Sequence, residues 1–260
     1  MGLRMRALVT GAGGRIGAAL AVALAELGHD VAVHYATSKD GADATAESVA
    51  GHGRRGVTLQ ADLLDLDACE TLVERAATAL GGPLDVLVNN ASIFEYDSIE
   101  TATRTSWDRH MRSNLQAPFI LTQAFAAQVP GPASDGEPVA RANIINMIDQ
   151  RVRKLTPEFM TYTLAKAGLW TLTQTSAQAL APRVRVNAIG PGPTLRGGRQ
   201  TEEHFAKQRA ATVLNRGSDV DDIADALRYI LSAKALTGQL LCIDGGQHLG
   251  WQTPDVIGME

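Results

Sequence analysis

The chain has 260 residues, which suits one large α/β domain with a buried core and is short for two independent domains. Hydrophobic residues make up 45% and charged residues 20%, as in an ordinary soluble globular protein. The formal net charge of −4 lacks the basic excess of a nucleic-acid binder, and no apolar run approaches the ~20 residues of a membrane-spanning helix.

Short apolar runs alternate with longer helical patterns along the whole chain. The expected strands cover residues 6–11, 30–35, 56–62, 84–91, 142–147, 183–189 and 239–244. The expected helices cover residues 15–28, 41–50, 67–80, 103–128, 160–180 and 219–232. Nearly continuous apolar strands between helices are typical of a parallel sheet covered on both faces. Right-handed crossovers then give an α/β fold, a Rossmann-like doubly wound sheet of about seven strands.

Two segments have the composition of irregular loops. Residues 130–141 are rich in Pro, Gly and polar residues, and we expect them on the surface. Residues 190–205 follow the sixth strand, at the edge where open parallel sheets bind ligands. We therefore predict a single domain over residues 1–260 with a substrate lid at 190–212, in which Leu195 and Arg199 lie near the substrate.

A glycine-rich turn, TGAGGRIG at residues 10–17, lies between the first strand and the first helix. Glycines there let backbone N–H groups approach a pyrophosphate at a helix amino terminus, which predicts dinucleotide binding. The spacing resembles the TGxxxGxG turn of the short-chain dehydrogenase/reductase family, except that Arg15 replaces the middle glycine. Arg15 is either a tolerated surface substitution or a guanidinium beside the cofactor phosphates and the substrate.

The end of the second strand distinguishes the two nicotinamide cofactors. NAD enzymes usually carry a carboxylate there for the ribose 2′-OH, but residues 33–39 contain none. Hydroxyls and a lysine accept a 2′-phosphate, so we expect NADP(H), the alternative being a merely solvated strand end. With the family resemblance, the expected cofactor-binding residues are Gly11, Arg15, Ile16, Gly17, His34, Tyr35, Thr37, Ser38, Asp62, Leu63, Asn90, Ala91, Ser92, Tyr162, Lys166, Pro191 and Gly192.

The expected reaction centre consists of Asn114, Asp149, Tyr162 and Lys166, which stand in the order and contexts of the family tetrad. The resemblance covers essentially the whole chain. The charge of Lys166 is expected to stabilise the phenolate and lower the pKa of Tyr162 from its usual value of about 10. The resemblance further implies that Asn114 holds a water near Lys166 and extends a proton path.

Asp149 occupies the position of the family's serine. An ionised aspartate only accepts hydrogen bonds, so it cannot donate one to a substrate carbonyl oxygen as the serine does. Either Asp149 is protonated, or the substrate presents N–H donors or basic ring nitrogens.

One branch of the family resembles the chain in these departures, namely the pteridine reductases and the short-chain dihydromonapterin and dihydrofolate reductases. They carry Arg where Arg15 stands, Asp where Asp149 stands, and an aromatic residue after NNAS, here Phe94. The resemblance implies that a flat pterin stacks between Phe94 and the nicotinamide. The substrate-contacting residues it implies are Arg15, Ser92, Phe94, Asp149, Tyr162 and Leu195.

The leading hypothesis is an NADPH-dependent reductase of dihydropterins or dihydrofolate. The alternative is a reductase of another carbonyl substrate, such as a 3-oxoacyl thioester or a sugar, with Asp149 protonated. A catalytically idle cofactor sensor is disfavoured, because Asn114, Tyr162 and Lys166 are all present.

Partners and location follow from composition and from the resemblance. The resemblance implies a homotetramer, and we expect no nucleic-acid or membrane partner. Two distant cysteines and the lack of a signal-peptide core favour a cytoplasmic protein. The six histidines show no metal-ligand spacing, so we expect no metal and interpret them as surface or packing residues.

Overall fold

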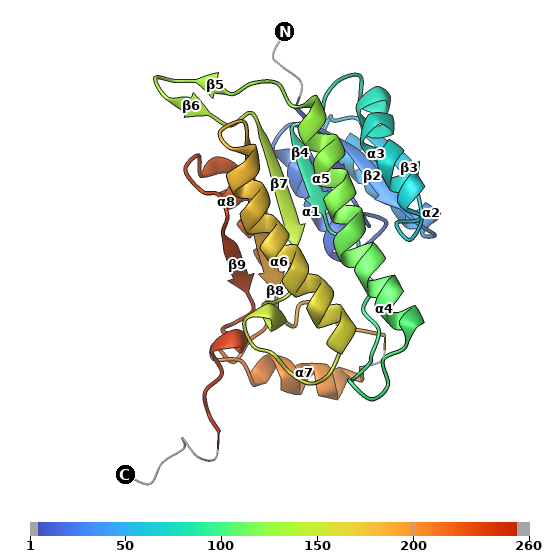
Figure 1. The fold of residues 1–260 in the computed structure, drawn as a ribbon, viewed down its shortest axis with the longest axis vertical. Coiled ribbons are helices and arrows are strands. Elements are labelled where there is room, and N and C mark those ends of the chain that lie inside the picture. Colours follow the sequence, from blue (N-terminus) through green and yellow to red (C-terminus); the bar gives the residue numbers. More distant parts are fainter. Residues whose placement is uncertain (1–4, 199, 254–260) are drawn as a thin grey trace.

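A computed structural model describes residues 5–198 and 200–253 (Figure 1). Seven parallel strands form one sheet in the order β3-β2-β1-β4-β7-β8-β9. These strands are β1 (Met5–Val9), β2 (His29–Tyr35), β3 (Gly56–Gln60), β4 (Val86–Asn89), β7 (Ala142–Met147), β8 (Val184–Pro191) and β9 (Leu240–Ile243). The strand order reverses between β1 and β4, and this switch point is where open sheets of this kind bind ligands. The predicted doubly wound fold is confirmed.

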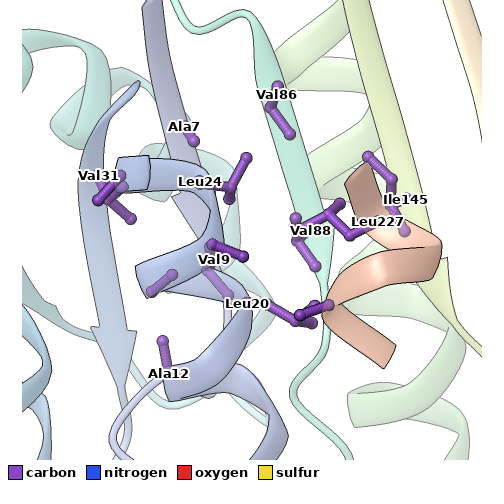
Figure 2. Packing of buried hydrophobic residues seen from close by; sticks show 14 of the residues in the cluster. Ala7, Val9, Ala12, Leu20, Leu24, Val31, Val86, Val88, Ile145 and Leu227 are labelled. Carbon is purple, nitrogen blue, oxygen red and sulfur yellow. The ribbon is translucent and has the colours of Figure 1, made fainter. Parts of the chain in front are cut away.

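Helices cover both faces of the sheet. They are α1 (Arg15–Glu26), α2 (Lys39–Gly51), α3 (Leu66–Leu80), α4 (Arg104–Met111), α5 (Ala117–Gln128), α6 (Met160–Leu180), α7 (Glu202–Ala210) and α8 (Val220–Ser232). Successive side chains of a strand point to opposite faces. Val9 therefore packs in the core cluster of α1 and α8, whereas Leu8 packs in the cluster of α3 and α5. Figure 2 shows Leu20 and Leu24 of α1 and Leu227 of α8 beside the strands in the first of these clusters.

Three segments differ from the expected elements. The expected surface loop at 130–141 contains a short antiparallel hairpin, β5 (Ala133–Ser134) with β6 (Pro138–Val139). The loop after β8 leads into α7, which starts where the Thr201 hydroxyl accepts the backbone N–H of His204. The expected helix at 103–128 is divided by a π-helical turn, η1 (Arg112–Gln116).

Within the residues that the structure describes, we find no helix with the length and apolar character needed to cross a membrane.

Candidate active site

The glycine-rich turn is shaped by close backbone contacts at the carboxyl end of β1. A Cβ on Gly17 would lie 2.3 Å from the backbone oxygen of Gly11 and 2.5 Å from Nδ2 of Asn90, so only glycine fits. Gly14 is the N-cap of α1 and provides no side-chain cap, and a Cβ there would meet nothing within 4 Å. The first N–H groups of α1 are thus uncapped beside open space at the positive end of the helix dipole, which fits a pyrophosphate.

A small hydrogen-bond network joins this turn to the end of β4. Asn90 donates from Nδ2 to the backbone oxygens of Thr10 and Gly11, at 2.9 and 3.0 Å. In return the Thr10 hydroxyl accepts the backbone N–H groups of Asn90 and Ala91, at 2.9 and 3.0 Å. The expected cofactor residues Asn90 and Ala91 therefore lie directly against the glycine turn.

His34 lies near the end of β2 and contacts the glycine turn. The residue is buried, with its Nδ1 accepting the N–H of Gly11 at 3.0 Å and its Nε2 3.1 Å from the oxygen of Ala61. Burial lowers the pKa of His34 to about 4, so the ring is neutral at physiological pH and donates from Nε2. His34 therefore holds the glycine turn against the chain that follows β3, and its expected role in cofactor binding stays a prediction.

Among the remaining expected cofactor residues, Ser38 contacts the same turn. Ser38 donates its hydroxyl to the backbone oxygen of Gly13 at 3.1 Å, and Lys39 forms an ion pair with Asp43. Leu63 is buried, whereas partly or fully exposed positions are found at Ile16, Tyr35, Thr37, Ser38, Asp62, Pro191 and Gly192.

The reaction centre joins the end of β7 to the first turns of α6. Tyr162 donates its hydroxyl to Oδ2 of Asp149 at 3.0 Å, and Oδ1 of Asp149 accepts the backbone N–H of Arg151 at 2.8 Å. Lys166 is buried and donates from Nζ to the backbone oxygen of Met147 at 2.8 Å. Three of the four residues expected in the reaction centre thus converge on one point.

Burial dominates the electrostatics of these groups. It raises the pKa of Asp149, against the opposing effect of the Arg151 N–H, and lowers the pKa of Lys166 to about 8. The pKa of Tyr162 is raised well above 10, first by burial and then by the charge of Asp149. The expected lowering by Lys166 is not found, because Asp149 contacts the phenol directly while Nζ lies 5.7 Å from the ring centroid.

Asn114, the fourth residue of the expected centre, is fully buried in the π-helical turn η1. Its Oδ1 accepts the N–H of Ile93 at 2.9 Å, and its Nδ2 donates to the oxygen of Ile93 at 2.8 Å. Both polar ends of this side chain thus bind the loop after β4, and the expectation that Asn114 holds a water near Lys166 stays a prediction. Asn114 therefore fixes the segment that carries Phe94.

Aromatic rings form one wall of the site. Phe94 lies edge-to-face against Tyr162, with ring centroids 4.7 Å apart, and stacks on Phe159 at 4.3 Å with an interplanar angle of 8°. Tyr96 meets the edge of Phe159 at 5.2 Å. Ser92, also expected at the substrate, is exposed. A hydrogen bond from its hydroxyl lowers the pKa of Tyr162, but this effect is smaller than the effects that raise it. Phe159 and Tyr96 were not expected here, because no local pattern places them beside Phe94.

A buried polar network supports this wall from behind. Asp97 accepts the backbone N–H of Thr161 at 3.1 Å and the Thr161 hydroxyl at 2.5 Å. The same hydroxyl lies 2.7 Å from Nδ1 of His110, whose Nε2 accepts the N–H of Glu95 at 3.1 Å. His110 is fully buried, so it is a structural link between α4, α6 and the loop of Phe94.

Arg15 connects the glycine turn to the first part of the expected lid. Arg15 has φ 53°, a conformation that explains why glycine is usual at this position, and its guanidinium reaches the backbone oxygens of Leu195 and Arg196 at 3.5 and 3.4 Å. Arg15 and Leu195 are therefore neighbours, as the sequence suggested. Arg199 lies outside the described residues.

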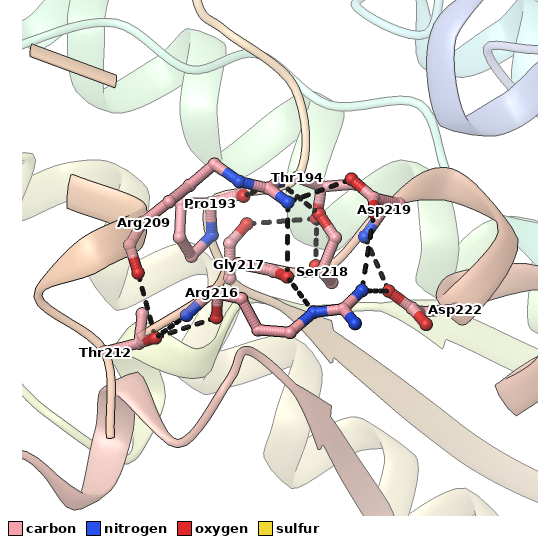
Figure 3. Close-up of polar contacts among 10 residues, drawn as sticks. Pro193, Thr194, Arg209, Thr212, Arg216, Gly217, Ser218, Asp219 and Asp222 are labelled. Atoms are coloured by element: carbon pink, nitrogen blue, oxygen red, sulfur yellow. Dashed lines mark hydrogen bonds and ion pairs between the residues drawn. The ribbon is translucent and has the colours of Figure 1, made fainter. Parts of the chain in front are cut away.

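Polar contacts attach α7, whose residues Glu202–Ala210 are all described and include none that is buried. Arg209 donates to the backbone oxygens of Pro193 and Ser218, at 3.0 and 2.7 Å, and pairs with Asp219 at 3.0 Å (Figure 3). The segment is thus fastened by a polar cluster, without an apolar core of its own.

Comparison with known proteins places this geometry in context. Residues 11–248 match the family model described as Enoyl-(Acyl carrier protein) reductase. The crystal structure of FolM Alternative dihydrofolate reductase 1 from Brucella suis, in complex with NADP, is 41% identical with a TM-score of 0.90, covering 97% of this chain and 98% of that one. An uncharacterized oxidoreductase of Methylorubrum extorquens is 36% identical over 92% of this chain and 96% of its own. The 3-oxoacyl-[acyl-carrier-protein] reductase FabG of Staphylococcus aureus is 31% identical over 96% of this chain and all of its own.

Proposed function

We propose that this chain, which belongs to the short-chain dehydrogenase/reductase family, is an NADPH-dependent reductase of a dihydropterin or of dihydrofolate. The observation that carries the proposal is the 3.0 Å hydrogen bond from Tyr162 to Asp149, at the position where the family pattern has serine. The similarity to the Brucella suis dihydrofolate reductase supports it.

The chain's own residues fit the cofactor. Bound NADPH would supply a hydride from its nicotinamide ring. The uncapped amino terminus of α1 would bind the pyrophosphate, and Arg15 with the carboxylate-free end of β2 would suit the 2′-phosphate. His34 would act indirectly, by holding the glycine turn against β3.

The reacting proton would pass through Asp149 and Tyr162. Because burial raises the pKa of both groups, the pair retains a proton that it can deliver to a ring nitrogen. In that step an O–H bond breaks and an N–H bond forms beside the carbon that has received the hydride. When ionised, Asp149 accepts hydrogen bonds from the amino and N–H groups of a pterin. Lys166 places a positive charge next to the pair.

The test is NADPH oxidation with dihydrofolate, dihydrobiopterin and dihydromonapterin, beside acetoacetyl thioesters and simple ketones. We expect turnover with at least one pterin. Asp149→Ser should lower kcat/KM for that pterin at least ~100-fold while leaving the Kd of NADPH unchanged. Brisk turnover of a ketone together with no turnover of any pterin would refute the proposal.

Carbonyl reduction is the second candidate, and the raised pKa of Asp149 favours it. A protonated carboxyl can donate a hydrogen bond to a carbonyl oxygen, as serine does elsewhere in the family. In that case Asp149→Ser should retain or increase ketone turnover, which distinguishes the two candidates.

Three further features belong to the proposal. Residues 190–212 act as the substrate lid, fastened by Arg209 and reached by Arg15. The chain assembles as a homotetramer and works in the cytoplasm. Light scattering of the purified protein measures the assembly, and a monomer would contradict that part.

A further inference from the structure

Phe159 has an unusual backbone conformation for its residue type. Its φ of 55° and ψ of 47° lie in the left-handed region, at the N-cap of α6, and its side chain forms no cap hydrogen bond. A bulky residue is strained in this region, and such strain gathers at functional sites. Phe159 lies three positions before Tyr162, so something other than helix capping retains the phenyl ring beside the reaction centre.

Both faces of the Phe159 ring are covered. Phe94 stacks on one face, with ring centroids 4.3 Å apart, and the guanidinium carbon of Arg151 lies over the ring at 5.1 Å. Because the stacked Phe94 fills one face, we infer that the guanidinium lies over the other. Tyr96 closes an edge at 5.2 Å. A flat ligand therefore cannot stack on Phe159 itself, and the ring serves as backing for its neighbour.

Phe94 is the ring that such a ligand would meet. It is 46% exposed and lies edge-to-face against Tyr162, which places it at the reacting group. Phe159 limits the tilt of Phe94, because two rings with an interplanar angle of 8° leave no room for rotation toward each other. Phe159, which lies behind Phe94, therefore sets the position of the Phe94 ring.

Arg151 connects this backing to the acid–base pair. Its backbone N–H binds Oδ1 of Asp149 at 2.8 Å, while its side chain covers Phe159 and contacts Thr156. Its Nε is buried and has no hydrogen-bond partner among the residues that the structure describes. The guanidinium is therefore held by a cation–π contact with the Phe159 face and by the hydrogen bond from Nη1 to Thr156. Its charge also lowers the pKa of Asp149.

We infer that Phe159 and Arg151 are positioning residues that determine specificity for flat, nitrogen-containing rings, by fixing Phe94 at a set distance from Tyr162. The order of layers is Arg151, Phe159, Phe94 and then the substrate ring. This inference rests on the proposed function, since it takes the substrate to be a heterocycle that stacks on Phe94.

Phe159→Gly tests the role of the backing ring, because glycine accepts the left-handed backbone without strain. The relief of backbone strain offsets part of the lost ring packing, so we expect only a small change in the unfolding midpoint, and a KM for the dihydropterin that rises about tenfold. The kcat and the Kd of NADPH should stay within about twofold, because neither the acid–base pair nor the glycine turn is altered. Phe159→Tyr should restore the wild-type KM. A merely structural residue would show the opposite pattern, with loss of stability and unchanged KM.

Arg151→Met tests the outer layer, with Arg153→Met as its matched control. Arg153 has the same kind of contact, 5.6 Å from the centroid of Trp170, but it does not contact the wall. We expect Arg151→Met to raise the KM for the dihydropterin and move the acidic limb of its pH profile upward, since the pKa of Asp149 rises. Arg153→Met should change neither.

The possible results separate this inference from the proposed function. A wild-type enzyme without pterin turnover overturns both. If the wild type reduces a pterin but Phe159→Gly keeps the wild-type KM, only the present inference is overturned. Equal effects of Arg151→Met and Arg153→Met also overturn it.

Discussion

His34 should make the stability of the fold depend on pH. Its neutral ring accepts from Gly11 and donates to Ala61, so protonation would set two N–H groups against each other at Gly11. We consider His34→Asn, whose oxygen can still accept the N–H of Gly11 but cannot reach Ala61. At pH 7 the lost hydrogen bond should cost about 1–3 kcal/mol.

The magnitude of the pH effect follows from the pKa of His34, which burial lowers from 6.5 to about 4. Between these values the unfolded chain binds a proton that the folded chain does not, so the free energy of unfolding falls as the pH falls. The loss is about 2 kcal/mol at pH 5 and approaches about 3 kcal/mol below pH 4. The variant lacks this titration, so its disadvantage relative to wild type should shrink by about 2 kcal/mol between pH 7 and pH 5.

Urea denaturation of both proteins at pH 7, 6 and 5 measures this difference. Burial also lowers the pKa of His29, but that contribution is common to both proteins and cancels in the comparison. A gap between wild type and His34→Asn that stays constant from pH 7 to pH 5 would refute the reasoning.

Three other changes have defined outcomes. Gly17→Ala should weaken NADPH binding at least tenfold in a fluorescence titration, because its Cβ would clash with the glycine turn. The pKa of Lys166 is about 8, so its charge is present below that pH and lost above it; kcat/KM should fall as the pH rises through 8, and a flat profile from 7 to 9 would contradict this. Thr161→Val removes the hydroxyl that donates to the buried Asp97 and should cost about 1–3 kcal/mol on urea denaturation. Thr163→Val is its control, since the Thr163 hydroxyl has no partner among the described residues, and an equal cost for both would count against the network.

The sheet and its helices could be predicted from the sequence because strand and helix periods are local. The ends of β7 and α6 fall within one residue of the expected limits, which placed Asp149, Tyr162 and Lys166 together. The sequence could not predict features that depend on contacts between distant segments. The burial of His34 depends on its contacts with the glycine turn and with the residue after β3. No pattern in the sequence next to His34 indicates either contact.

The aromatic wall shows the same limit. Phe94 could be proposed from its place after NNAS, since that motif fixes its distance from β4. Phe159 could not, because its left-handed backbone and its stacking on Phe94 are tertiary properties. The direction of the Tyr162 pKa was also wrong for a tertiary reason: the charged neighbour that contacts the phenol is Asp149, and Lys166 is turned toward Met147.

The π-helical turn at η1 has a consequence for the length of the chain. A π-turn holds one residue more than regular α-helical hydrogen bonding needs. Deleting one residue there would let α4 and α5 join in a single regular helix, and it would shift the residues of the turn, Asn114 among them, around the axis relative to the flanking helices. Asn114 would then swing away from Ile93, and the loop of Phe94 would lose its clamp. The enzyme should therefore tolerate insertions and deletions in the β5–β6 hairpin. It should not tolerate a deletion in η1, because the more regular helix would displace Asn114 and the loop that carries Phe94.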